Sequence, residues 1–209
     1  MTALPDHAGL LAHFRQHDPR IADVMNAVGP HRLRPDNRYF QVLARAIVSQ
    51  QISTRAADTI YSRFAKLFEN RRPRPGPLLS LAEDDLRAAG LSRQKIVYMR
   101  DLARHFEEGH VRPRRFRSMD NHEIIEQLVQ VKGIGRWTVE MFLIFSLNRP
   151  DVLPVDDLGL RSAVQKIYNL KAQPDARTLK TIGAPWNPYE SVATWYAWQF
   201  LRLPEKESR

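Results

Sequence analysis

Hydrophobic positions recur every three or four residues along most of the chain, and the alternating runs that mark half-buried strands are missing. The segment 39–64, YFQVLARAIVSQQISTRAADTIYSRF, carries two such amphipathic stretches separated by the polar SQQIST. Capping residues predict further helices from 92 to about 109, after the pair Asp120 and Glu123, and from about 157 to 168. The pattern therefore predicts an all-α fold.

Proline and polar residues predict where these helices are interrupted. RRPRPGP, residues 71–77, predicts a basic loop, after which Ser80 and Glu83 have the spacing of a capping box that opens a short helix. A looser stretch precedes the last helix, for which Asn187 is expected as N-cap and Pro188 as the first helical residue. The expected architecture is a succession of helices joined by short loops.

The balance of charge points to a polyanionic partner. The 209 residues include 32 Lys and Arg against 23 Asp and Glu, which gives a formal charge of +9 and a pI near 10.2. No run approaches the roughly 18 apolar residues of a membrane-spanning helix, and the first residues lack the features of a secretory signal. We expect an intracellular protein that does not bind membranes, either cytoplasmic and associated with the nucleoid or nuclear.

The residues that commonly bind metals limit the chemistry further. The chain has no cysteine, which excludes disulfides, thiol catalysis, cysteine zinc sites and cysteine-held iron–sulfur clusters. The seven histidines are scattered, and only His13 and His17 stand four residues apart, as two metal ligands on one helix face would. With no third ligand near them, a solvated helix face is the expected interpretation.

Residues 131–140, VKGIGRWTVE, place Gly133 and Gly135 between two helical stretches. Because glycine inside a helix costs about 1 kcal/mol relative to alanine, the pair predicts a tight hairpin that ends one helix and starts the next. At the start of the second helix, the N–H groups and the helix dipole form a site for an anion such as a phosphate. Any helix–helix turn can carry two glycines, however, so this pattern alone does not establish phosphate binding.

Several ordered motifs together resemble one family. Residues 128–139 are similar to the helix-hairpin-helix motif of DNA glycosylases, in which the hairpin grips a DNA phosphate. LPVDDLGL then supplies Asp156 and Asp157 where that superfamily has a catalytic aspartate, and Asp157 follows Gly135 by 22 residues. The stretches AIVSQQIS, GLSRQKIVYMRDLA and WNPYESVATWYAW resemble the 3-methyladenine glycosylase branch, so that the resemblance covers about 39–203.

The resemblance implies a monofunctional glycosylase that hydrolyses the N-glycosidic bond of alkylated purines, 3-methyladenine and 7-methylguanine, in duplex DNA and so initiates base excision repair. This reaction builds positive charge on the sugar, which a buried carboxylate stabilises while it orients or deprotonates water. We expect Asp157 to take this role and Asp156 to cap or support the loop, although Asp157 also has the spacing of a helix N-cap. Members of the superfamily that cut the strand carry a lysine where this chain has Trp137, so no lyase activity is implied.

An aromatic pocket selects cationic alkylated purines by stacking and cation–π attraction. Trp137 is expected to form one wall, and one or two of the aromatic residues near the C-terminus are expected to reach the cleft while the others pack in the core. Met141 stands where some relatives have an aromatic residue, which leaves the range of bases open. The residues expected in the substrate pocket are Trp137, Met141, Tyr39, Trp186 and Trp195.

The damaged base has to leave the duplex, and in the family a wedge from the SQQIS turn fills the gap. This implies Gln51 as the wedge with Gln50 beside it, and a plain polar turn between helices is the alternative. The basic segments 71–74 and 112–117, together with Lys95, are candidates for phosphate contacts. The residues expected to contact DNA at the turn and the hairpin are Gln50, Gln51, Lys132, Gly133, Ile134, Gly135, Arg136 and Thr138.

The resemblance implies no organic cofactor. It does imply that the carbonyl groups of Val129, Val131 and Ile134 hold a monovalent ion at the hairpin when DNA is bound. The expected partner is damaged double-stranded DNA, and we expect the protein to act on it as a monomer.

Two helical lobes are expected within the single catalytic unit 1–209. The central lobe is 38–149 and contains the hairpin, and the second lobe is 1–37 plus 150–209 and contains the catalytic aspartate. By this interpretation damaged DNA lies across the cleft between the lobes.

Two alternatives stay open. Within the same class, the excised base is ethenoadenine, hypoxanthine or an oxidised base in place of an alkylated purine. From another class, a non-catalytic helix-hairpin-helix DNA-binding module explains the charge and the glycines but leaves Asp157, Trp137 and their spacing to chance. An assay of base excision separates these possibilities.

Overall fold

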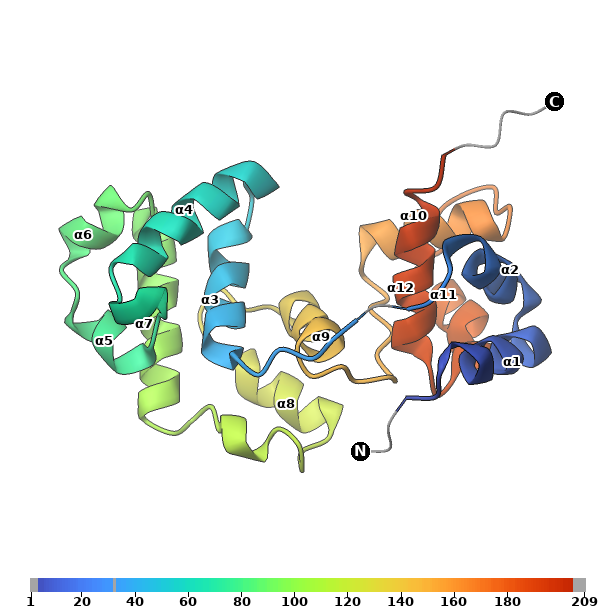
Figure 1. Cartoon of the computed structure of the whole chain (residues 1–209), viewed down its shortest axis with the longest axis horizontal. Helices are drawn as coiled ribbons and strands as arrows, with labels where there is room; N and C mark the ends of the chain where they lie inside the picture. Colours follow the sequence, from blue (N-terminus) through green and yellow to red (C-terminus); the bar gives the residue numbers. More distant parts are fainter. Residues whose placement is uncertain (1–3, 32, 205–209) are drawn as a thin grey trace. The chain divides into compact units, whose positions relative to one another are not determined.

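The computed structural model describes residues 4–31 and 33–204. All secondary-structure elements within these residues are helices (Figure 1). The all-α prediction is therefore confirmed. The chain forms two compact units: unit 1 comprises Met1–Arg34 and Asn148–Arg209, and unit 2 comprises Pro35–Leu147. The sequence placed the lobe boundaries at 37/38 and 149/150, two or three residues further along the chain.

Unit 2 is built around its long helix α7. The 15-residue α7 packs against α3 and α5, α3 also packs against α4 and α9, and α8 packs against α9. Fully buried side chains from several of these helices, including Leu43, Ile47, Phe64, Leu78 and Met99, form the core. The helices of unit 2 are α3 (Tyr39–Ser49), α4 (Thr54–Lys66), η1 (Glu69–Arg71), α5 (Pro75–Ser80), α6 (Glu83–Ala88), α7 (Arg93–Glu107), η2 (Pro113–Arg115), α8 (Asn121–Leu128) and α9 (Arg136–Phe145).

Unit 1 is built around its last helix, α12, which packs against α2 and α10 (Figure 1). Its core is tied by Asp18, which is buried, caps α2 through the Ile21 N–H and accepts hydrogen bonds from the Trp186 indole N–H at 2.8 Å and from the Tyr168 hydroxyl. Burial raises the pKa of Tyr168, so its hydroxyl remains a donor. The helices of unit 1 are α1 (His7–His17), α2 (Pro19–Val28), α10 (Leu158–Ile167), α11 (Ala176–Gly183), η3 (Ala184–Trp186) and α12 (Glu190–Phe200).

Most predicted helices lie where the capping residues placed them, and the segment 71–77 is an exception. It is not one loop, because α5 begins at Pro75, where the missing N–H and the fixed φ of proline suit the first turn of a helix. Ser80 consequently ends α5 and does not open the next helix, whose N-cap position is Ala82. The predicted capping box is therefore wrong, whereas the box formed by Asp120 and Glu123 at α8 is confirmed.

The region before the last helix also differs from the prediction. Residues 176–183 form α11, capped by Asp175, where the sequence indicated only a looser stretch. The last helix begins at Glu190 and not at Pro188. Asn187 does not cap it through an accepting oxygen, because its side-chain amide donates to the Glu190 carboxylate at 2.9 Å.

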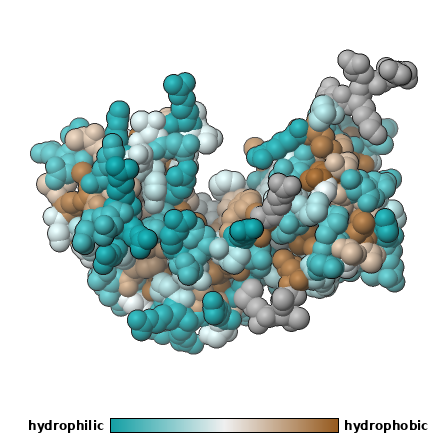
Figure 2. All heavy atoms as spheres, in the orientation of Figure 1, coloured by the Kyte–Doolittle hydropathy of each residue, from teal (hydrophilic) through white to brown (hydrophobic). Residues whose placement is uncertain are grey.

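The surface carries mostly polar side chains. Hydrophilic residues cover most of the visible face of each unit, with hydrophobic residues between them (Figure 2). None of the described helices is both long and apolar enough to cross a membrane.

Candidate functional site

The two-glycine hairpin is present and joins α8 to α9. Gly133 has φ +81°, a left-handed conformation that glycine adopts without strain, and a Cβ at this position would lie 2.2 Å from the Tyr98 ring. Gly135 occupies the N-cap position of α9 with an extended backbone. The turn is closed by the Ile134 N–H, which donates to the Val131 carbonyl at 3.0 Å. Gly133 is therefore required by its positive φ and by the close approach of the Tyr98 ring, whereas a Cβ at Gly135 would meet nothing within 4 Å.

The hairpin leaves main-chain donors available for an anion. The first amides of a helix have no acceptor within the helix, and Gly135 has no side chain to provide one for α9. Lys132 is exposed, while Val131 and Ile134 are buried, so that only the backbone of Ile134 is in a position to make the predicted DNA contact. A positive helix end with free N–H groups is the arrangement that binds phosphates.

Arg136 adds a fixed positive charge next to these amides. Its guanidinium Nε lies 3.0 Å from the Glu140 carboxylate one turn later, and Glu140 is only 4% exposed whereas Arg136 is largely exposed. The buried carboxylate fixes the Nε end of the guanidinium, while 62% of the arginine side chain remains exposed. The arginines of the basic segments 71–74 and 112–117 are likewise exposed.

A hollow of about 420 Å³ lies beside the hairpin within unit 2. Trp137 and Met141 are four residues apart on one face of α9, and Trp137 is 49% exposed. Thr138 is mostly buried and lines this hollow, which makes it a pocket residue more than a surface contact. The lining residues are Ala46, Ser49, Gln50, Gln51, Trp137, Thr138 and Met141. The structure thus brings together five predicted site residues, two predicted for the pocket and three predicted to contact DNA.

The predicted pocket residue Tyr39 lies elsewhere in unit 2. Its ring packs edge-on against Phe116 at 5.3 Å and Phe142 at 5.7 Å between centroids. These ring contacts account for Tyr39, which is partly buried, by packing alone, and its place in the substrate pocket stays a prediction. The helical spacing of aromatic residues cannot separate these two roles.

The turn after α3 presents the two glutamines differently. Gln50 ends α3, and its side-chain amide donates to the Gly133 carbonyl at 2.7 Å, which links this turn to the hairpin. Gln51 is exposed and has φ +57°, an uncommon conformation for a residue with a side chain. Lys95, a candidate phosphate contact by sequence, instead directs its ammonium group to the Val48 and Gln50 carbonyls at 2.7 and 2.9 Å.

The candidate catalytic carboxylate belongs to unit 1. Asp157 is 8% exposed and is the N-cap of α10, where its Oδ1 accepts the Leu160 N–H at 2.6 Å and the Trp198 indole N–H at 2.8 Å. A Cβ on Gly159 would lie 3.2 Å from this oxygen and 3.3 Å from the indole nitrogen, so glycine leaves room for the pair. Asp157 is thus both a cap and a buried, oriented carboxylate, and the two interpretations are compatible.

Asp156 has the supporting role that the sequence indicated. Its side chain is 67% exposed and lies 3.1 Å from the Arg161 guanidinium, which also donates to the Val155 carbonyl at 2.8 Å. The interaction fastens the loop before α10. Asp156 and Asp157 therefore differ in burial and in partners although they are neighbours in the sequence.

The C-terminal aromatic residues divide into core and surface groups. Trp186 is fully buried with its indole N–H on Asp18, so its predicted place in the substrate pocket is wrong. Trp195 is partly exposed, and its ring lies edge-on to His31 at 4.9 Å. Burial lowers the pKa of His31 to about 4. Trp198, which the pocket prediction did not include, is the residue that contacts the candidate catalytic carboxylate.

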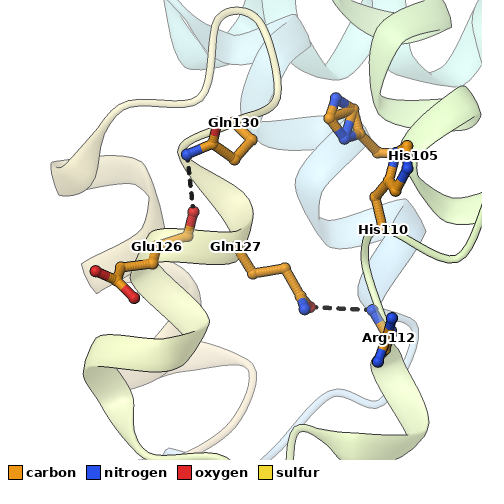
Figure 3. Close-up of a pocket in the computed structure, with 6 residues that line it drawn as sticks. All are labelled: His105, His110, Arg112, Glu126, Gln127 and Gln130. Atoms are coloured by element: carbon orange, nitrogen blue, oxygen red, sulfur yellow. Dashed lines mark hydrogen bonds between the residues drawn. The ribbon is translucent and has the colours of Figure 1, made fainter.

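A second, polar hollow lies between the end of α7 and α8 (Figure 3). Its side chains are occupied locally: the Gln127 amide oxygen accepts the Arg112 N–H at 3.0 Å, and the Gln130 amide donates to the Glu126 carbonyl at 3.3 Å. In Figure 3 the Glu126 carboxylate points away from the histidines on the far side of the hollow. This arrangement supports the loop before α8.

Metal-binding clusters are not formed by the described part of the chain, where no three His, Cys, Asp or Glu side chains are grouped suitably. His13 and His17, the pair at ligand spacing, stack on each other with ring centroids 4.3 Å apart.

The hairpin that precedes α9 and the buried carboxylate 22 residues later in the chain are the features by which the sequence resembles the helix-hairpin-helix DNA glycosylases. The family described as HhH-GPD superfamily base excision DNA repair protein matches residues 44–188. The chain belongs to this family, as its motifs indicated.

The similarity to individual proteins extends over nearly the whole chain. The chain is 34% identical over 188 residues to DNA-3-methyladenine glycosylase 1 of Schizosaccharomyces pombe, covering 89% of this chain and 82% of that protein. The structure of a 3-methyladenine DNA glycosylase from the same organism in complex with abasic DNA matches with a TM-score of 0.85 at 32% identity, covering 96% of this chain and all of that one. A DNA-3-methyladenine glycosidase structure from Bacillus halodurans matches with a TM-score of 0.80 at 36% identity, covering 90% and 86%.

Proposed function

We propose that this protein is a DNA-3-methyladenine glycosylase that removes alkylated purines, 3-methyladenine and 7-methylguanine, from duplex DNA and so initiates base excision repair. The observation that carries the proposal is the similarity to DNA-3-methyladenine glycosylase 1 over most of both chains, in a structure that forms the hairpin and buries Asp157. The site of action is wherever the DNA lies, the nucleoid or the nucleus. We propose that one copy of the chain suffices.

The proposed reaction is hydrolysis by a dissociative route. An alkylated purine is cationic, so the bond from C1′ to the ring nitrogen breaks with both electrons on the nitrogen, and the base leaves as a neutral molecule. The Asp157 carboxylate stabilises the positive charge that develops on the sugar. It also orients a water whose oxygen bonds to C1′ and whose proton passes to the carboxylate or to solvent. The products are a free base and an abasic site.

Selectivity in this proposal comes from the hollow beside the hairpin. The exposed face of Trp137 provides an electron-rich surface, and stacking with a cationic base is worth about 0.5–2 kcal/mol. Met141 offers a flexible, polarisable wall one helical turn further on. Trp195 of unit 1 stays a candidate for contact with the base.

DNA binding in this proposal uses the backbone of the hairpin and the turn after α3. The amides near Gly135 and the side chains of Lys132 and Arg136 hold a phosphate, and Gln51 enters the duplex when the base is flipped out. The tie from Gln50 to the Gly133 carbonyl keeps the two segments together.

The carbonyl groups of Val129, Val131 and Ile134 fit a monovalent ion in their chemistry, because main-chain oxygens are neutral, hard donors. The Val131 carbonyl accepts the Ile134 N–H and retains a second lone pair. Such an ion would supply positive charge next to the bound phosphate and takes no part in the chemistry at the sugar.

The absence of lyase activity is also part of the proposal. A lyase of this class needs an amine nucleophile at the position of Trp137, and an indole cannot form a Schiff base. Treatment with borohydride during turnover should therefore trap no covalent adduct between protein and DNA. A trapped adduct would contradict the monofunctional mechanism.

Release of free bases from methylated duplex DNA, measured by mass spectrometry, tests the function. We expect 3-methyladenine and 7-methylguanine to be released and abasic sites to appear in equal amount. Release only of ethenoadenine, hypoxanthine or oxidised bases from a parallel panel would move the activity to another lesion class. Binding to an abasic-site analogue without release of any base would favour a non-catalytic DNA-binding module.

A further inference from the structure

One face of α7 contacts both segments that the proposed function assigns to DNA. Lys95, Tyr98 and Asp101 follow at intervals of three residues and so lie on one side of the helix. Lys95 donates to the turn after α3, the Tyr98 ring lies under Gly133, and Asp101 accepts the Lys132 N–H at 2.9 Å. We call these three residues the α7 stripe.

The contacts of Lys95 fix the end of α3 and the residue immediately before Gln51, the residue of the turn with a positive φ. Its ammonium lies 2.7 Å from the Val48 carbonyl and 2.9 Å from the Gln50 carbonyl, immediately before Gln51. A positive charge at the carboxyl end of a helix such as α3 is favourable, because it compensates carbonyl groups that have no partner within the helix. Burial lowers the pKa of Lys95, as expected for an ammonium that has exchanged water for carbonyl oxygens.

The hairpin is held from the same helix. Asp101 is 8% exposed and accepts a hydrogen bond from the backbone of the hairpin, while the Tyr98 ring fills the space that a side chain at residue 133 would need. Gln50 links the turn directly to the hairpin, because its side-chain amide donates to the Gly133 carbonyl at 2.7 Å. The turn and the hairpin are thus connected to each other directly and to α7 separately.

We propose that Lys95 is a positioning residue for base flipping, which holds the Gln50–Gln51 turn at a fixed place relative to the hairpin so that wedge insertion and phosphate binding occur together. The inference rests on the proposed function. Flipping costs a few kcal/mol, and a wedge that is ordered before DNA binds contributes more of that energy than one that must be ordered on binding. Lys95 acts through the turn and does not contact the reacting atoms.

The alternatives make different predictions. A lysine that contacts a phosphate raises the dependence of DNA affinity on salt and affects all DNA substrates alike. A lysine that serves stability alone lowers the melting temperature and affects duplex and single-stranded substrates equally. A positioning role affects chiefly the substrate in which a base has to be flipped.

Lys95→Met removes the charge and the donors and retains the length of the side chain, and Arg93→Met is the matched control, because Arg93 is exposed at the start of the same helix. Single-turnover release of 7-methylguanine is measured from a duplex and from the corresponding single strand. For Lys95→Met we expect a loss of about tenfold on the duplex and less than twofold on the single strand. Arg93→Met should match the wild type on both.

Equal losses on the two substrates, or no loss on the duplex, would overturn the proposal. The proposal would also be overturned by a second result. In it, Lys95→Met reduces the salt dependence of binding to an abasic duplex by the equivalent of one phosphate contact, and the ratio of the duplex rate to the single-strand rate stays unchanged. Should Lys95→Met lower the melting temperature too far for assay, Gln50→Leu tests the same coupling, because it removes only the amide that reaches the hairpin. The expected selective loss on the duplex is then the same.

A readout without chemistry separates this proposal from the proposed function. A 2-aminopurine placed opposite an abasic analogue becomes fluorescent when it is unstacked. We expect binding of wild type and Arg93→Met to raise this fluorescence and binding of Lys95→Met to raise it less, even if the wild type releases no methylated base. The same fluorescence with all three proteins would overturn the role of Lys95, whereas absence of base release from the wild type would overturn only the function.

Discussion

The hairpin in unit 2 and the carboxylate in unit 1 are built in opposite ways. The hairpin exposes main-chain groups, and its shape is fixed from below by side chains of α7 that are distant in sequence. The carboxylate of Asp157 is a side-chain group, held by the first turn of its own helix and by one indole 41 residues later. The first region is suited to bind any DNA backbone, and the second is suited to orient one oxygen.

The difference teaches which property each region should control. Main-chain donors at a helix end determine affinity, because every DNA has a phosphate to offer. A single buried carboxylate determines rate, because it interacts most strongly with charge that exists only in the transition state. Variants of the two regions should accordingly separate binding from chemistry.

The largest expected effect is on the chemistry of unit 1. Asp157→Asn keeps an equally good N-cap for α10 and removes the negative charge. We expect single-turnover base release to fall about 10³-fold, with affinity for an abasic-site analogue within about twofold of the wild type. Unchanged release would remove Asp157 from the mechanism, and an equal loss of affinity would break the division between the two regions.

The next effect belongs to the binding region. Gly133→Ala places a Cβ against Tyr98 at a positive φ, so the hairpin has to distort, and we expect at least about a tenfold loss of DNA affinity with a lower melting temperature. Gly135→Ala is the matched control for folding, because its φ is −92° and a Cβ there has nothing within 4 Å. Thermal unfolding and fluorescence anisotropy measure the two effects. Equal melting temperatures for the two variants would contradict the assignment of Gly133.

A smaller effect should come from the partner of the carboxylate. Trp198→Phe removes the indole donor and retains an aromatic ring, and we expect base release to fall about five- to tenfold at unchanged DNA affinity. If the indole acts by orienting Asp157, the same substitution in an Asp157→Asn background should have much less effect. Losses that simply multiply in the double variant would show that Trp198 acts independently.

The smallest effect is a dependence of stability on pH in unit 1. Burial lowers the pKa of His31 to about 4 from an ordinary value near 6.5, so the unfolded chain binds the proton first and stability falls as the pH drops from 6.5 towards 4. His13, also in unit 1, has a pKa lowered by burial and adds to the same trend. We expect the melting temperature of His31→Gln to change less than that of the wild type between pH 7 and pH 4.5. An identical change in both would exclude His31 as a source.

The sequence predicted the structure correctly at residues whose identity is set by local backbone conformation. Gly133 and Gly135, Ser92 and the pair Asp120 and Glu123 each occupy the predicted place, because turns and caps depend on local geometry. The family resemblance pointed to Asp157, whose catalytic role stays a prediction, and its capping bond to Leu160 is a local feature of the same kind.

Features that depend on packing were missed or misassigned. Trp186, Trp195 and Trp198 share an aromatic character and helical spacing, yet one is buried on Asp18, one is partly exposed and one contacts Asp157. Lys95 belonged by composition to the basic surface, but α7 directs it to two carbonyl groups. Only the three-dimensional arrangement of helices distinguishes the three tryptophans from one another, and Lys95 from the other basic residues, because within each group the charge and hydrophobicity of the side chains are alike.

The N-cap position of α9 has a consequence for anyone who engineers this protein. Gly135 has the extended backbone of a typical N-cap, and Gly135→Ser would supply the missing acceptor and contribute a few tenths of a kcal/mol to stability. That gain would occupy the amides intended for a phosphate. A selection for heat resistance would therefore favour this change and reduce DNA binding. In the proposed complex, a DNA phosphate takes the place of the N-cap side chain that α9 lacks.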